Sequence, residues 1–358
     1  MLRNSISRLI ICISLILGAP SANADGEDHG DRALRVMTRN MDLGSDFGYI
    51  FEALATNPND QSALLMAITK TYLEVLSSRI PQRADALAAE IQNTQPDLVA
   101  LQEVSKVSTG PFNAPATTVV EDQLDALLDA LHRRGLHYAP VHINKNADVT
   151  LPSLDASFQH FIDVRLVDFD VVLARTDLNE SEFKLENVHH ANFAAAVVLP
   201  IAGVNVTFPN GWIAIDAKLR GKTYRFVDTH LGTVSPVQAA QTQELLSGPL
   251  NTDLPVILAG DLNSDAHAPS FANGPAYLML INAGFLDAWY MLHQSDPGLT
   301  WPLFGEDPPL GPTSLFERID LILAKGNEVQ ATKILRTGTT PPFASDHAGL
   351  VADFKLSP

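Results

Sequence analysis

The chain has 358 residues, of which 41 are acidic and 24 are lysine or arginine, and its formal net charge is −17. So acidic a surface argues against broad electrostatic binding of nucleic acid, because phosphates attract clusters of lysine and arginine. It does not exclude an anionic substrate, since a bound cation reverses the field locally. The hydrophobic fraction of 46% is that of an ordinary globular protein with a sizeable core.

The first 24 residues predict a secretory signal peptide. Arg3 and Arg8 give a positive start, Leu9 to Leu17 is an apolar run, and Ala22-Asn23-Ala24 is a small-x-small cleavage site. The apolar run is far shorter than the ~20 residues that span a bilayer. The single cysteine, Cys12, lies inside this segment, so no disulfide is expected after cleavage. We expect cleavage after Ala24 and export to a bacterial periplasm or the medium.

The remainder predicts an acidic, disordered tail at 25–32 and then a single domain over 33–358, without linkers or repeats. Expected strands cover 34–40, 96–103, 169–175, 211–219, 223–231, 256–259, 318–324 and 347–354. Expected helices cover 61–78, a segment from about Pro81, 121–135 and 236–246. Segments 142–168 and 292–317 are rich in Pro, Asp and His and are interpreted as long loops. Mixed strands and helices with hairpins predict an α/β or α+β sandwich.

Polar residues follow several of the expected strands. The stretch VILAGDLNSD begins as a buried strand and ends in Asp261 and Asn263, which taken alone make turns. Five further expected strands carry polar residues in or beside them, namely Asn40 and Asp42, Glu103, His230, Asp320, and Asp346 with His347. Because an isolated buried carboxylate is costly unless paired or bound to metal, we expect these residues to form one site at a sheet edge.

The motifs RNMD, LQEV, DTHL, GDLNSD, RIDLIL and SDH occur in this order. Together they resemble the endonuclease/exonuclease/phosphatase superfamily, the deoxyribonuclease I-like proteins, over about residues 34–354. The resemblance is closest to exported bacterial members whose substrate is unassigned. It implies a four-layer αββα sandwich of two facing mixed sheets flanked by helices, with the site at their common edge. It also implies a Mg²⁺-dependent phosphoric ester hydrolase.

The resemblance further implies a metal site. Glu103 would be the main Mg²⁺ ligand, with Asn40, Asp42 and Asp346 nearby. Oxygen ligands suit a hard cation, and Mn²⁺ is the alternative ion.

The same resemblance implies catalytic roles for five residues. Asp261 would orient or deprotonate the attacking water, or protonate the leaving oxygen, and Asn263 would hold a phosphate oxygen. His347 would act as an acid/base group or stabilise the transition state, with Asp320 fixing its ring. His230 would contact the scissile phosphate.

The sequence leaves the roles of some further residues open. Asp168 or Asp170 is a candidate carboxylate partner for His230, with plain surface acids as the alternative. Thr300 stands where the family often has a short Gly-x-Thr motif. The aromatic residues of the loop 204–212 suggest a lipid contact, but a core or edge-strand role is favoured.

The expected reaction is in-line attack of water on a phosphodiester or phosphomonoester. The substrate class includes small-molecule, lipid and nucleic-acid phosphates, with net charge against nucleic acid. A secreted endonuclease acting on DNA or RNA is the alternative enzyme. A non-catalytic binding protein that retains the fold is the alternative of another class. We expect a monomer, and transient contact with membrane lipid.

Overall fold

Two large mixed sheets dominate the structure, a computed structural model that describes residues 33–201, 204–303, 315–326 and 329–356. The predicted signal peptide and acidic tail lie outside the described residues. No helix in the described ranges is long and apolar enough to cross a membrane.

The first sheet has seven strands in the order β14-β15-β1-β2-β5-β4, with β3 paired to β2. These strands are β1 (Leu34–Asn40), β2 (Leu98–Pro111), β3 (Thr118–Asp122), β4 (Tyr138–Leu154), β5 (Phe161–Arg175), β14 (Val329–Thr337) and β15 (Gly349–Leu356). Only the β1–β2 pair is parallel among the pairings described in this sheet.

The second sheet has six strands in the order β12-β13-β11-β10-β9-β6. These strands are β6 (Phe183–Asn192), β9 (Gly211–Leu219), β10 (Lys222–His230), β11 (Val256–Asp261), β12 (Leu286–Asp287) and β13 (Asp320–Lys325). Here β10 and β11 run parallel, whereas β11 and β13 run antiparallel with Asp261 opposite Asp320.

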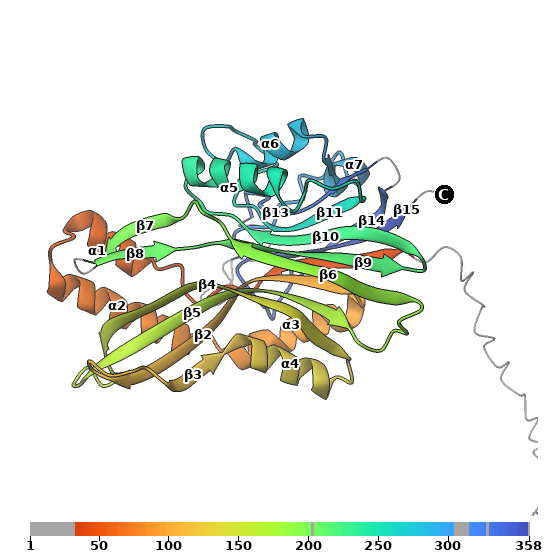
Figure 1. The fold of residues 1–358 in the computed structure, drawn as a ribbon. Coiled ribbons are helices and arrows are strands. Elements are labelled where there is room, and N and C mark those ends of the chain that lie inside the picture. The colour runs from red at the N-terminus through yellow and green to blue at the C-terminus, as the bar shows by residue number, and fades with distance from the viewer. Residues whose placement is uncertain (1–32, 202–203, 304–314, 327–328, 357–358) are drawn as a thin grey trace, which may run out of the picture. The chain divides into compact units, whose positions relative to one another are not determined.

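Helices cover the outer faces of both sheets (Figure 1). The helices among the described residues are α1 (Gly48–Thr56), α2 (Gln61–Ser77), α3 (Ile80–Thr94), α4 (Gln123–Arg133), α5 (Ser235–Ser247), α6 (Ala276–Asn282) and α7 (Ala288–Leu292). Helix α3 begins with a proline in its first turn, where the missing N–H costs nothing. Its residues Leu87 and Ile91 lie one turn apart and pack on the first sheet together with Leu127 of α4.

Three apolar layers show why the sheets stack. Between them lies a core that includes Val172 of the first sheet and Phe226 of the second. A second cluster joins α3 and α4 to the outer face of the first sheet, and a third joins α5 and α6 to the outer face of the second. The strand β11 is fully buried because its two faces contribute to two of these layers. The predicted four-layer αββα sandwich is therefore confirmed.

A lateral cluster joins α1 and α2 to the two-stranded sheet of β7 (Val197–Ile201) and β8 (Val204–Phe208). Phe208 packs partly buried in it, and Trp212 packs against the α5–α6 layer. Both side chains thus take the packing role favoured from the sequence.

The prediction of a long loop over 142–168 is wrong, because β4 and β5 extend through it as an antiparallel pair. Polar residues in this segment interact across the strands, as Arg165 does with Asp148, the Nε–Oδ1 distance being 2.7 Å. Pro152 is tolerated because β4 is an edge strand. Of the second predicted loop, 292–317, residues 304–314 lie outside the described part.

Candidate active site

The predicted site residues come together where strands of both sheets end. Asn40, His230 and Asp261 close β1, β10 and β11, and Asp320 opens the antiparallel β13. His347 lies two residues before β15. Because β10 and β11 are parallel and β13 is antiparallel to β11, these ends reach the same edge.

Asn40 links the two sheets at this edge. Its Nδ2 donates to Glu103 Oε1 at 2.9 Å and to Asp261 Oδ2 at 3.0 Å. The second carboxylate oxygen of Glu103 accepts from the backbone N–H of Leu43 at 3.0 Å. The Oδ1 of Asn40 accepts from the N–H of Asp42, so this side chain orders the loop after β1.

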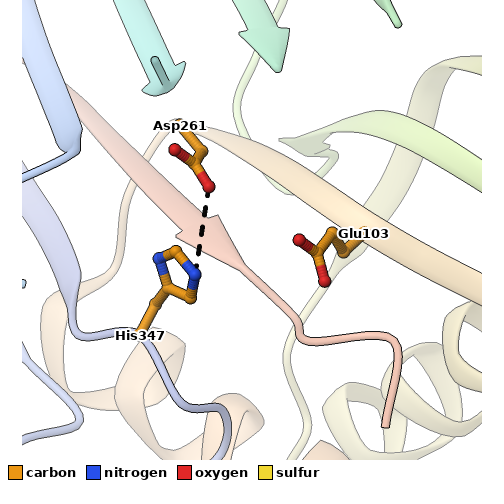
Figure 2. A group of neighbouring side chains, drawn as sticks. All are labelled: Glu103, Asp261 and His347. Carbon is orange, nitrogen blue, oxygen red and sulfur yellow. Dashed lines mark ion pairs between the residues drawn. The ribbon is translucent and has the colours of Figure 1, made fainter. Parts of the chain in front are cut away.

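Glu103, Asp261 and His347 form a group that could hold a metal ion. Each offers one ligand atom, and these atoms lie within 4.8 Å of one another. Figure 2 shows the three side chains converging on one space. Burial raises the pKa of Asp261, against the effect of the two nearby histidines. A bound cation would favour the ionised carboxylate, so the donor set fits a divalent metal.

Asp42 and Asp346 lie at the border of this group. Asp42 forms an ion pair with Arg83 at 3.2 Å, and burial raises its pKa while Arg83 lowers it. Asp346 Oδ1 is 3.9 Å from His347 Nε2, and its Oδ2 accepts from Trp301 Nε1 at 3.1 Å. Both acids were predicted as metal ligands, but neither belongs to the group of close ligand atoms formed by Glu103, Asp261 and His347.

His347 is held between two carboxylates. Its Nδ1 is 2.8 Å from Asp320 Oδ2, and its Nε2 faces Asp261 Oδ2 at 3.9 Å. Burial lowers the pKa of His347, but the negative charges of Asp320, Asp346 and Asp261 outweigh it and raise this pKa well above its usual value. Thr300 Oγ1 accepts from the backbone N–H of Asp320, which fixes the start of β13.

His230 faces Asp261 from the other side, with 3.7 Å between Nε2 and Oδ2. Its Nε2 also lies 3.1 Å from Asn263 Nδ2, so the amide can donate to an unprotonated ring nitrogen. Asn263 donates as well to the carbonyl of Leu231 at 2.8 Å. The imidazole and the amide therefore form one polar wall beside Asp261.

Neither candidate carboxylate forms a hydrogen bond or ion pair with His230 among the described residues, and His230 Nδ1 and Asp168 Oδ1 are both buried without a hydrogen-bond partner. Burial raises the pKa of Asp168 to about 6, and His230 is the largest influence in the opposite direction. Burial raises the pKa of Asp170 well above its usual range, with Asp228 and Asp168 adding to the effect.

Comparison with known proteins agrees with this geometry. A model of the Endonuclease/Exonuclease/phosphatase family matches residues 75–347. The chain belongs to this family. Comparison with curated protein sequences gives no match.

Several solved structures share the fold. A family protein from Leptotrichia buccalis aligns with a TM-score of 0.54 and 16% identity over 90% of this chain and 100% of that one. A second family protein, from Bacteroides vulgatus, aligns with a TM-score of 0.53 and 16% identity over 90% of this chain and 99% of that one. The catalytic domain of human nocturnin aligns with a TM-score of 0.50 and 18% identity over 91% of this chain and 95% of that one.

The sequence did not predict the roles of two buried arginines, Arg83 and Arg39. Arg83 of α3 bonds the carbonyls of Met41, Asp42 and Ala344, and thereby ties the loop after β1 to the loop before β15. Arg39 of β1 bonds the carbonyl of His347. Each arginine occupies a position of the strand or helix where the pattern predicts a buried apolar residue. A buried arginine requires a partner, so this position could have indicated a structural role.

Proposed function

We propose that this family member is a Mg²⁺-dependent phosphoesterase, with Mn²⁺ as the alternative ion, that hydrolyses a phosphodiester or phosphomonoester by in-line attack of water. The observation that carries the proposal is the convergence of Glu103, Asp261 and His347, with His230 and Asn263 beside them. A bound divalent cation would polarise a phosphoryl oxygen.

The chain's own groups supply positioning and proton transfer. His347 and His230 both lie within 3.9 Å of Asp261 Oδ2, so a water molecule bound there would meet a carboxylate and two imidazoles. If the carboxylates hold the metal without His347, this imidazole, kept protonated by Asp320, can donate to a phosphoryl or leaving oxygen. The Asn263 amide adds a hydrogen bond to phosphate without adding negative charge.

The proposed substrate class comprises small-molecule, lipid and nucleic-acid phosphates. The net charge of −17 supports a compact phosphate ester over a long polyanion. A secreted endonuclease is retained as the alternative, because the proposed attack of water on phosphorus would be the same for the phosphodiester of a nucleic acid. We further propose a monomer, exported by the signal peptide with cleavage after Ala24, and transient contact with membrane lipid.

The test is hydrolysis of bis-(p-nitrophenyl) phosphate and p-nitrophenyl phosphate by the protein from Asp25 onward, with Mg²⁺, with Mn²⁺ and with EDTA. Metal-dependent release that is absent in His347→Ala is the expected result. Nicking of supercoiled plasmid under the same conditions would favour the endonuclease. Metal binding without turnover of either ester or of DNA would contradict the proposal and favour a binding protein.

The proposed export has a separate test. Expression of the full chain in a bacterium with a periplasm should place a protein there whose N-terminus, by mass spectrometry, is Asp25. Retention of the uncleaved chain in the cytoplasm would contradict the proposal.

A further inference from the structure

Glu103 owes its direction to an irregularity in β2. Leu101 pairs with Val171 of β5 and Val104 pairs with Phe169, so Gln102 and Glu103 both stand opposite the single residue Asp170. Such a β-bulge turns a side chain away from the regular alternation. Glu103 itself has φ 56°, a left-handed conformation that a glutamate rarely adopts. Surrounding contacts must therefore hold the bulge in place.

Gln102 supplies these contacts because its amide is bonded at both ends. Its Oε1 accepts from Thr38 Oγ1 at 3.3 Å, within the first sheet. Its Nε2 donates to Asp228 Oδ1 at 2.7 Å, across to the second sheet. All three side chains have 0% exposure, so water cannot replace either bond.

Asp228 connects the hydrogen bond of Gln102 to the strand that carries His230. It lies two residues before His230 on β10, and residues two apart on a strand share one face. The bond from Gln102 therefore joins the bulge that aims Glu103 to the strand that delivers His230.

We propose that Gln102 and Asp228 are positioning residues, whose hydrogen bond across the two sheets holds the bulge and so fixes Glu103 relative to His230. This inference rests on the proposed function in one respect, the role of Glu103 as a metal ligand. Gln102 and Asp228 themselves contact neither metal nor substrate in this proposal.

The charge of Asp228 is not what the link needs. Its Oδ2 has no hydrogen-bond partner among the described residues, and burial raises its pKa well above the usual range. Asparagine at this position would keep an acceptor for Gln102 and remove a costly buried carboxyl group. Leucine has a similar size but offers no acceptor. The two replacements thus separate the hydrogen bond from the charge.

The experiment compares wild type, Gln102→Met, Asp228→Leu, their double variant, Asp228→Asn and the control Ser153→Ala. The control removes a buried hydroxyl that bonds Thr69 on α2, away from the bulge. Mn²⁺ affinity is measured by electron paramagnetic resonance, the backbone at 102–104 by amide hydrogen exchange in metal-free protein, and turnover with bis-(p-nitrophenyl) phosphate.

Gln102→Met and Asp228→Leu should each weaken Mn²⁺ binding on the order of tenfold or more, as losses behind metal ligands do. Both variants should speed amide exchange at the bulge. The double variant should bind Mn²⁺ no more weakly than the single variant with the lower affinity. Asp228→Asn and Ser153→Ala should stay within about twofold of wild type in Mn²⁺ affinity, well inside the change expected from a lost contact of this kind.

Unchanged amide exchange at 102–104 in Gln102→Met would overturn the proposal. So would equal losses in Asp228→Asn and Asp228→Leu, because the charge would then be the cause. If Asp228→Leu does not fold, Asp228→Asn is compared with Gln102→Met instead, and equal losses in these two variants would overturn the proposal. If wild type neither binds Mn²⁺ nor hydrolyses the ester, the proposed function fails, whereas hydrogen exchange still decides whether Gln102 holds the bulge.

Discussion

Replacement of Arg83 by methionine should destabilise the fold by about 3 kcal/mol, because breaking a buried ion pair costs about 3–5 kcal/mol and the lower end applies here. The side chain of Arg83 is 6% exposed, whereas that of its partner Asp42 is 24% exposed, so solvent screens part of the pair. The carbonyls of Met41, Asp42 and Ala344 also lose a donor. Such a loss is a large part of the roughly 5–15 kcal/mol that stabilises a protein domain.

Urea unfolding of the metal-free protein, followed by tryptophan fluorescence, measures this free energy. Arg83→Lys should lose about half as much, because lysine keeps the charge but not the planar fork that reaches several acceptors. Arg133→Met is the control, since this arginine is 59% exposed and should change stability by no more than about 0.5 kcal/mol. A decrease in unfolding free energy of less than about 1 kcal/mol in Arg83→Met would contradict the role of Arg83 in holding the two loops together.

Asp320→Asn should lower the pKa of His347 in the metal-free protein, because burial then acts without the adjacent carboxylate; an imidazole NMR titration at the wild-type value would contradict this. As the His347 pKa is raised in wild type, the stability lost in Asp320→Asn should be greatest below the unfolded pKa of about 6.5 and diminish as pH rises through the folded value. Asp261→Ala should abolish metal-dependent ester hydrolysis while circular dichroism stays unchanged, and activity at the wild-type level would remove Asp261 from the mechanism. Phe226→Ala should cost about 3–5 kcal/mol in urea unfolding, since its ring fills the space between the sheets; a loss under about 1 kcal/mol would mean that this core is loosely packed.

Local patterns predicted those elements whose burial follows directly from the sequence. The apolar run of β11 and the helical spacing of α3 both predict their structure, because one is buried on two faces and the other on one. The strand β4 and the part of β5 before Phe169 were missed because their polar residues are satisfied by partners on the neighbouring strand, as Asp148 is by Arg165. A single strand cannot show what its neighbour will supply.

The family, the layer architecture and the residue types of the site could be predicted from the sequence, since Glu103, Asp261 and His347 each lie in or beside a strand that the apolar pattern predicts. The directions of these side chains depend on contacts between distant parts of the chain. The bulge exists because Gln102 and Glu103 share one partner on β5, and it is anchored by Asp228 of the opposite sheet. Contacts between residues 126 positions apart leave no local periodicity, so their geometry becomes visible only when the two sheets are packed face to face.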